Sequence, residues 1–497
     1  MAEPLPRPSV PVADAFTQEY LAFYRFLPVA LAHGRLRVAV AGTPCREALD
    51  DLKETYGAEL ELFQVDDDAL AAGIRLTFDP ADSIDELAQS LASEGGDPDR
   101  SESAPTDVRA LANEPPVVRF VNLLIREAST ANASDIHLEA TREGLRARLR
   151  IDGVLSDLTA PPPALHAAIV SRIKLLAELD IAERRQPQDG RIRVRLDQRE
   201  LDLRVATVPT VFGESVVLRL LDRGGRPVGL DELGLAADDL GSFTGLARRP
   251  HGILVATGPT GSGKTTSLYA ALALRDATQE KIITVEDPVE YHLERVSQVP
   301  VQVKAGVTFA SALRSILRQD PDVLMIGEMR DRETAAIAVQ AAMTGHLVFS
   351  TLHTNDAISA IGRLADLGVE PYMIAATVEA VLAQRLVRRI CGSCAERYRV
   401  GPEAIALLAE RPSTAELFHR GAGCAECRHT GYRGRVGIFE LLRFTEEVKD
   451  AVARRAGTAQ LRDLARRQGM TTLRQDGLRK ARAGITTIEE VHRVTQG

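Results

Sequence analysis

The sequence is poor in aromatic and sulfur side chains: its 497 residues include no tryptophan, 4% aromatic residues and five cysteines. The scarcity of aromatic rings argues against the stacking platforms that bind single-stranded nucleic acid. Five cysteines are too few for a disulfide scaffold. No stretch approaches the roughly 18 consecutive apolar residues of a membrane span, and the N-terminus lacks a basic segment followed by an apolar one, which predicts no signal peptide. We therefore expect a cytoplasmic protein, recruited peripherally to a membrane only through partners.

The charge and apolar content are those of a folded protein without a general affinity for polyanions. Apolar residues make up 45% and charged residues 26% of the chain, close to ordinary soluble usage, which excludes wholesale disorder. Lys and Arg number 61 against 69 Asp and Glu, a net charge of -8. Such an acidic chain can still carry a local basic patch. The length predicts about three domains.

Composition and periodicity divide the chain into six regions. We expect, in order, a small N-terminal α/β module, a flexible linker, an α+β domain whose sheet has one packed and one basic face, a parallel sheet covered on both sides, a cysteine-bearing segment and a helical remainder. The alternative for the linker is a surface loop within one domain. The regions cover residues 1–92, 93–116, 117–224, 225–390, 391–430 and 431–497.

A phosphate-binding motif lies between a buried-strand pattern at residues 253–257 and a helical pattern after it. Residues 258–265 fit G-x-x-x-x-G-K-[ST]. Its glycines let backbone N–H groups face the phosphates, Lys264 reaches the β/γ-phosphates, and the Thr265 hydroxyl can ligate Mg²⁺. Motif and context together predict a nucleotide site. The residues expected to bind it are Gly258, Pro259, Thr260, Gly261, Ser262, Gly263, Lys264, Thr265 and Thr266.

Two further strand patterns end in acids. Glu286 and Asp287 follow the run at 282–285, and Glu328 follows the apolar run at 321–327. Ligands of open α/β sheets sit beyond the carboxyl ends of the strands, where acids can hold Mg²⁺ or orient the attacking water. We predict that Glu328 orients or activates water and that Glu286 contributes to catalysis. The alternative for Glu286 and Asp287 is a helix cap or salt bridge.

Two histidines flank the next strand pattern, at residues 347–352. His353 follows it and His346 precedes it. Imidazoles beside a nucleotide can sense the γ-phosphate or carry protons. We predict such a role for His353, with a packed or surface position as the alternative for both residues.

The motifs together resemble the Walker A, Asp, Walker B and His boxes of type II/type IV secretion ATPases, most closely the type II secretion motors (GspE-like) and next the pilus-assembly motors. Three upstream runs resemble that family's preceding domain. The resemblance covers about residues 117–497. It rests on residues 258–265, 283–290, 322–331 and 344–355, and upstream on 133–139, 150–153 and 183–191.

The resemblance implies a homohexameric ring of subunits, each with a RecA-like P-loop motor domain and a preceding N2-type domain. It implies that Arg204 and Arg219 of the N2-type domain reach the nucleotide phosphates; from the residues alone, both could lie on the solvated face of a basic sheet. It further implies ATP and Mg²⁺ as cofactors. The implied partners are an inner-membrane platform protein (GspL-like), docked through the N-terminal module, and a polytopic one (GspF-like), without nucleic acid.

Four cysteines form two C-x₂-C pairs separated by 29 residues. Four thiolates from two such pairs suit a closed, tetrahedral structural Zn²⁺ site, and relatives with the same arrangement imply zinc as well. The gap is longer than usual, and a helix near residues 402–410 could fill it. A redox pair or free thiols are the alternatives. The predicted ligands are Cys391, Cys394, Cys424 and Cys427.

We therefore predict an ATP-hydrolysing motor that powers pseudopilus assembly and protein export across the outer membrane by type II secretion. A type IV pilus assembly ATPase is the alternative of the same class. A nucleic-acid translocase on the same core would be a different class, and the acidic charge and few aromatics argue against it.

Overall fold

The computed structural model places most of the chain. It describes residues 16, 18–32, 34–42, 45–78, 112, 114–196, 199–222, 228–401 and 417–496. The helix expected near residues 402–410 and most of the expected linker lie outside these ranges. Among the described residues, no helix has the length and apolar character needed to cross a membrane.

The N-terminal module is a three-stranded sheet in the order β1-β2-β3, with a buried core of its own. β1 and β2 pair antiparallel, whereas β2 and β3 pair parallel and are joined by α2. α2 ends at Gly57, whose φ of 58° needs a residue tolerant of the left-handed region. The small α/β module expected from the sequence is thus present. Its elements are α1 (Gln18–Tyr24), β1 (Phe26–Ala32), β2 (Arg35–Val40), α2 (Arg46–Tyr56), β3 (Glu59–Gln64) and α3 (Asp67–Phe78).

A six-stranded antiparallel sheet, in the order β6-β5-β4-β9-β8-β7, forms the next domain. Alternation along β8 explains its two faces: Leu201, Leu203 and Val205 are buried, and Arg204 lies on the opposite side. The strands predicted from alternating arginine and aliphatic residues are present. The elements are α6 (Pro115–Thr130), β4 (Asp135–Thr141), β5 (Gly144–Ile151), β6 (Val154–Asp157), α7 (His166–Leu176), β7 (Gln188–Leu196), β8 (Arg199–Thr210) and β9 (Gly213–Asp222), with the short η1 (Pro163–Leu165) before α7.

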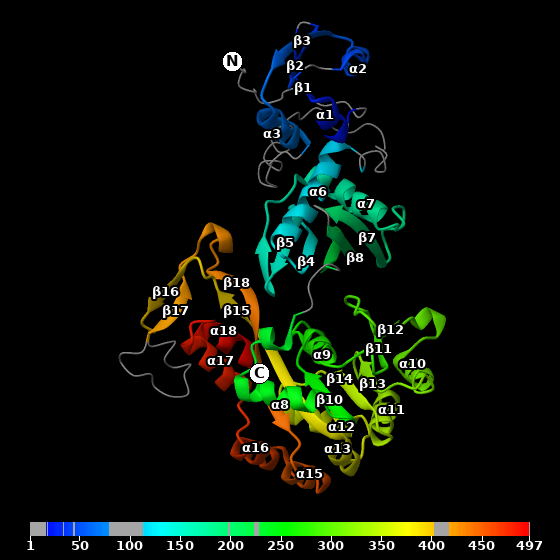
Figure 1. The fold of residues 1–497 in the computed structure, drawn as a ribbon, viewed down its shortest axis with the longest axis vertical. Helices are drawn as coiled ribbons and strands as arrows, with labels where there is room; N and C mark the ends of the chain where they lie inside the picture. Colours follow the sequence, from blue (N-terminus) through cyan, green and yellow to red (C-terminus); the bar gives the residue numbers. More distant parts are fainter. Residues whose placement is uncertain are drawn as a thin grey trace. The chain divides into compact units, whose positions relative to one another are not determined.

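The region expected to form the motor domain is built on a seven-stranded sheet in the order β12-β11-β13-β14-β10-β15-β18 (Figure 1). All neighbouring strands pair parallel except β15 and β18 at one edge. Most of the parallel strands carry short apolar runs because helices cover both faces, whereas the edge strand β12 is polar and is not buried. The parallel strands are β10 (Gly252–Thr257), β11 (Ile282–Glu286), β12 (Ser297–Pro300), β13 (Val323–Ile326), β14 (Leu347–Leu352) and β15 (Val378–Ile390), and the antiparallel strand is β18 (Tyr432–Arg443).

Two hydrophobic cores lie on opposite faces of this sheet. Along β10, Ile253 and Val255 belong to one core, and Leu254 and Ala256 belong to the other. Because the strands are parallel, their carboxyl ends lie on the same side of the sheet, and the nucleotide motifs meet there. The covering helices are α8 (Ala237–Ala247), α9 (Lys264–Leu272), α10 (Phe309–Ile316), α11 (Arg332–Met343), α12 (Ala357–Asp366) and α13 (Pro371–Thr377); η2 (Leu230–Leu233) and η3 (Val303–Ala305) are short turns.

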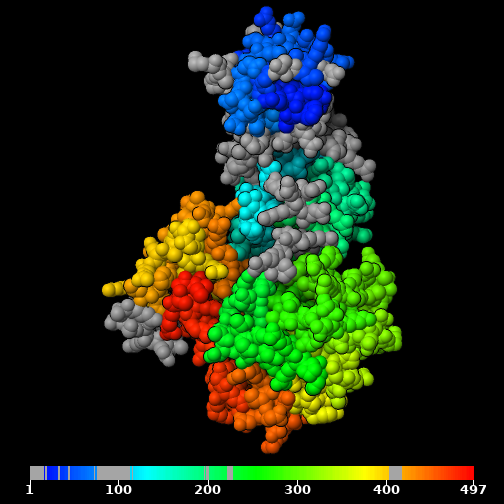
Figure 2. Space-filling model, in the orientation of Figure 1, coloured from blue at the N-terminus to red at the C-terminus, as the bar shows by residue number. Residues whose placement is uncertain are grey.

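The C-terminal region corrects one expectation. Residues 431–497 were expected to be helical, but β18 is a strand that pairs antiparallel with β15 from Ala380 to Ile390. The strand completes the motor sheet, and only the residues after it are helical. Figure 2 shows the surface of this C-terminal segment, orange to red, continuous with that of the motor domain in green and yellow. The helices are α15 (Glu446–Ala453), α16 (Thr458–Arg467), α17 (Leu473–Arg482) and α18 (Ile488–Thr495).

Candidate nucleotide and metal sites

The P-loop bends tightly between β10 and α9. Gly258 has a φ of 148°, and a Cβ atom there would lie 2.5 Å from the carbonyl oxygen of Gln384. Gly263, the residue before α9, has a φ of 87°. Only glycine fits the crowded first position, and the positive φ of the second favours it. The loop thus brings the N-terminal end of α9 to the strand edge, as the motif predicted.

Lys264 is held within the loop. Its Nζ donates hydrogen bonds to the carbonyl oxygens of Gly258, at 2.8 Å, and Pro259, at 3.0 Å. Burial lowers the pKa of the Lys264 ammonium to about 8, a shift that the positive charge of Arg385 reinforces and the negative charge of Glu328 opposes. The negative charge of Glu328 therefore acts on Lys264, the predicted phosphate-binding residue.

The remaining predicted nucleotide-binding residues follow the loop into the helix. Ser262 is buried, and its carbonyl oxygen accepts a hydrogen bond of 2.8 Å from Gln384 Nε2. Thr265 and Thr266 lie in the first turn of α9 and are half-buried. The backbone N–H groups at a helix start and the Thr265 hydroxyl are the donors and ligand that a phosphate with Mg²⁺ would need.

Glu328 and His353 meet at the same edge of the sheet. Glu328 follows β13 and is 9% exposed. Its carboxylate is paired with Arg330, and its Oε2 lies 3.3 Å from His353 Nε2. The structure thus brings the two predicted residues together. His346 lies at the opposite end of β14, where its Nδ1 is 2.8 Å from the carbonyl oxygen of Ala341, so it is not part of this site.

Glu286 ends β11 as predicted, but its carboxylate is enclosed. Glu286 is 1% exposed, and it accepts hydrogen bonds from Thr284 Oγ1 at 2.6 Å, Gln298 Nε2 at 3.1 Å and the Tyr269 hydroxyl. Burial and this contact raise the pKa of Tyr269 well above its ordinary value. Both oxygens of Glu286 therefore have protein partners, which favours a role in holding the loop after β11. Its catalytic role stays a prediction, and Asp287 beside it is exposed.

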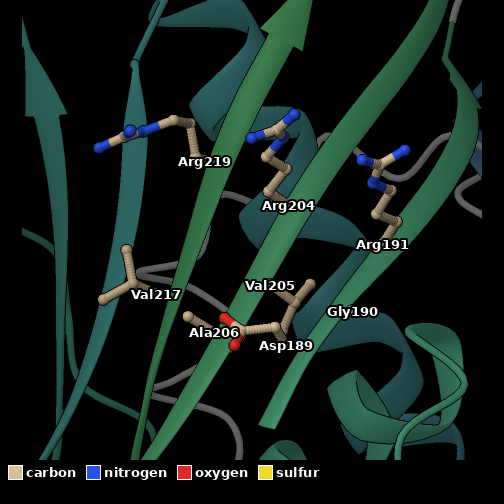
Figure 3. Close-up of a pocket in the computed structure, with 8 residues that line it drawn as sticks. All are labelled: Asp189, Gly190, Arg191, Arg204, Val205, Ala206, Val217 and Arg219. Atoms are coloured by element: carbon tan, nitrogen blue, oxygen red, sulfur yellow. The ribbon is translucent and has the colours of Figure 1, made fainter. Parts of the chain in front are cut away.

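Three arginines line an open cleft of about 580 Å³ on the basic face of the six-stranded sheet (Figure 3). Arg191, Arg204 and Arg219 lie directly opposite one another on β7, β8 and β9. Burial and the neighbouring Arg191 lower the pKa of the Arg204 guanidinium. Because like charges on adjacent strands repel, such a row is suited to an anion. The sequence singled out Arg204 and Arg219; Arg191 was missed, although its alternation with aliphatic residues was visible.

The four predicted zinc ligands converge. Their sulfur atoms lie within 4.8 Å of one another, with Sγ–Sγ distances of 3.9 Å for Cys391–Cys424, 3.8 Å for Cys394–Cys427 and 3.7 Å for Cys424–Cys427. Tetrahedral Zn²⁺ with Zn–S bonds of ~2.3 Å requires sulfurs ~3.8 Å apart. The donor set and its spacing therefore fit zinc. It is framed by β16 (Ala395–Tyr398), β17 (Phe418–Gly421) and η4 (Ala425–Cys427).

Backbone groups support the sulfur cluster. The N–H groups of Cys424 and Gly431 lie 3.1 and 3.2 Å from Cys427 Sγ, and that of Gly423 lies 3.3 Å from Cys394 Sγ. Such donors stabilise thiolates, the form that binds metal. Cys45 is exposed in the N-terminal module and takes no part.

Comparison with known proteins decides the family. The family described as Type II/IV secretion system protein matches residues 110–493. The chain belongs to this family. Together with the relatives and solved structures described next, this match confirms the type II secretion ATPase and the α/β fold predicted from the sequence motifs.

Relatives cover from about three quarters to nearly all of the chain. The Type II secretion system protein E of Xanthomonas campestris pv. campestris is 46% identical over 500 residues, which cover 99% of this chain and 86% of the relative. The protein E of Pseudomonas aeruginosa is 50% identical over 390 residues, 78% of each chain. The Type II secretion system ATPase E of Vibrio cholerae is 46% identical over 390 residues, 78% of this chain and 77% of the relative.

Solved structures share the architecture. The pilus retraction motor PilT with bound ADP has a TM-score of 0.51 and 26% identity, over 75% of this chain and 96% of that chain. The ATPase DotB of Legionella pneumophila has a TM-score of 0.55 and 22% identity, over 76% and 95% of the two chains, a likeness of fold alone.

Proposed function

We propose that the chain is the Mg²⁺-dependent motor of a type II secretion system, and that its ATP hydrolysis powers pseudopilus assembly and export across the outer membrane. One observation carries the chemistry: a P-loop lysine and a buried glutamate held by a histidine share one edge of a parallel sheet. Relatives that are named for type II secretion are 46–50% identical to this chain. They support a role in type II secretion over a role as a type IV pilus assembly ATPase.

The residues would divide the reaction among them. P-loop amides and Lys264 hold the phosphates, and Thr265 holds Mg²⁺. When bound, Mg²⁺ would neutralise charge on the β- and γ-phosphate oxygens. Glu328 orients the attacking water, and the contact with His353 fixes its carboxylate. Arg204 and Arg219 would bind the phosphate tail when the N2-type domain closes on the site, which supplies the movement of each stroke.

Assembly and recruitment complete the proposal. Subunits would form a hexameric ring, since the family membership supports a ring-forming motor. The N-terminal module would dock on a GspL-like cytoplasmic domain, and the ring would act on a GspF-like platform protein at the inner membrane. We propose that the domains have the boundaries predicted from the sequence and that the N-terminal module is the part that docks.

The test is the ATPase rate per subunit against protein concentration, with and without the cytoplasmic domain of the GspL-like partner. We expect the specific rate to rise with concentration and with the partner, and Lys264→Ala to abolish it. The matching domain of a pilus system is the control. Stimulation by the pilus domain alone would favour the pilus motor. An ATPase rate of Lys264→Ala equal to that of the unaltered chain would contradict the nucleotide site proposed at the P-loop.

A further inference from the structure

A guanidinium that has no counter-charge among the described residues lies on the strand that passes the P-loop. Strand β15 passes along the loop, since Gln384 Nε2 bonds to the Ser262 carbonyl oxygen and the Gln384 carbonyl oxygen crowds Gly258. The next residue, Arg385, points away from Gln384, as strand alternation requires. Its Nη2 donates a hydrogen bond of 3.0 Å to Asn355 Oδ1.

Within the described residues, Arg385 has no ionic partner, and its buried Nε has no hydrogen-bond partner. Burial lowers the pKa of its guanidinium, although arginine remains charged at any physiological pH. A half-buried charge with an unpaired donor is unfavourable unless something compensates it. The charge of Arg385 also acts on Lys264, which is itself a cation. Two cations that act on one another favour an anion that contacts both of them.

The neighbours of Arg385 indicate which part of the nucleotide it meets. Lys264 marks the β/γ-phosphates. Asn355 belongs to the loop after β14 that also carries His353, which contacts Glu328. The guanidinium therefore contacts the loop of the predicted water-orienting acid, and its charge acts on the predicted phosphate-binding lysine. The terminal phosphoryl group needs both the cations that hold it and the carboxylate that orients the attacking water.

We propose that Arg385 is a phosphate-binding residue of the same subunit, which contacts the terminal phosphate of ATP and is positioned by its hydrogen bond to Asn355. The inference rests on the proposed function. It adds to the arginines of the N2-type domain a guanidinium built into the motor sheet, which needs no domain closure to reach the nucleotide. Arg385 would thereby distinguish ATP from ADP.

The test measures affinities of the full chain for a non-hydrolysable ATP analogue and for ADP, in Arg385→Gln, Arg385→Lys and Arg389→Gln. Arg389 is the matched control because it is exposed on the same strand, four residues on. A charge-assisted hydrogen bond predicts that Arg385→Gln weakens analogue binding roughly 10- to 100-fold and ADP binding by less than about threefold. Arg385→Lys should recover part of the loss, and Arg389→Gln should change neither affinity.

The possible outcomes distinguish a failure of the role of Arg385 from a failure of the proposed ATPase function. Unchanged analogue affinity in Arg385→Gln, with binding abolished in Lys264→Ala, would overturn the role of Arg385 and leave the nucleotide site intact. Equal weakening of analogue and ADP would overturn terminal-phosphate recognition. A loss of activity that higher protein concentration restores, at unchanged affinity, would place Arg385 in subunit contact instead. Normal binding in Lys264→Ala would reject the proposed site itself.

Discussion

Arg219 Nε lies 2.9 Å from Asp135 Oδ1, across the pairing of β9 with β4. The carboxylate is 7% exposed and the arginine side chain 61%. Ser134 donates a further hydrogen bond of 2.8 Å to the same acid. Arg219 is turned away from Arg204 (Figure 3), which has no ion pair in the described part of the chain. A buried acid thus pairs with Arg219 and not with Arg204, the next arginine of the row.

Asp135→Asn should remove a pH-dependent part of the stability. Burial alone would raise the pKa of Asp135, but hydrogen bonds from Arg219 and Ser134 lower it below the ordinary 3.8. A lowered folded-state pKa adds stability above the unfolded-state pKa, and that stability is lost as the pH falls through the folded-state pKa. The difference in unfolding free energy between the two chains should therefore be constant near neutrality and shrink below pH 3.8. Denaturant unfolding from pH 7 downwards measures it, with the exposed Glu143→Gln as control; a difference independent of pH would contradict the ion pair.

ATP binding should take up a proton above pH 8. Burial holds the pKa of Lys264 at about 8 in the nucleotide-free chain, and phosphate contact must restore the charge. Affinity should then fall roughly tenfold per pH unit above 8, since one proton is linked to binding. Calorimetry at pH 9 in buffers of different ionisation enthalpy measures the uptake. Lys264→Arg, which stays charged, should show none; equal pH profiles for both chains would refute the lowered pKa.

Glu286→Gln should act mainly on stability. The substituted amide would set its NH2 group against one of the two hydroxyl donors, Tyr269 or Thr284, and breaking such a buried network costs about 1–3 kcal/mol. The exposed Asp287→Asn is the control and should change the unfolding free energy by less than about 0.5 kcal/mol. Chemical denaturation decides the matter. A large fall in kcat at unchanged stability would instead establish the catalytic role predicted from the sequence.

Zinc should be bound one ion per chain by the four converging cysteines. Cys427→Ser removes the sulfur that receives two backbone N–H contacts, so we expect loss of zinc and faster hydrogen exchange in β16 and β17. Cys45→Ser should retain the metal. Elemental analysis of the purified chains gives the stoichiometry. Full zinc content in Cys427→Ser would exclude this site.

Local patterns predicted the P-loop, the acids at strand ends and the zinc cysteines, because each is a short run whose chemistry depends on its neighbours in sequence. Glu328 and His353 could be paired because parallel strands end at one edge. β18 was taken for helix because its partner β15 lies some fifty residues earlier in the chain, and local periodicity does not encode such a pairing.

Register explains what sequence could not supply. The alignment of Arg191 with Arg204 and Arg219 depends on the pairing of three strands. Likewise, the enclosure of Glu286 depends on Gln298 from the neighbouring strand β12. The lack of an ionic partner for Arg385 among the described residues depends on how distant segments pack around it. These are properties of long-range packing, and a single sequence carries no signal of them beyond residue type.

The most direct test of the account is ATP turnover by the full chain with Mg²⁺, comparing the unaltered protein with Glu328→Gln while ATP affinity is measured in parallel. Removing a residue that orients or activates water should lower kcat by roughly 10²–10⁴-fold and leave the Kd for ATP nearly unchanged, since Lys264 and the P-loop amides remain. Full turnover in Glu328→Gln, or loss of ATP binding instead of turnover, would contradict the catalytic site placed at the end of β13.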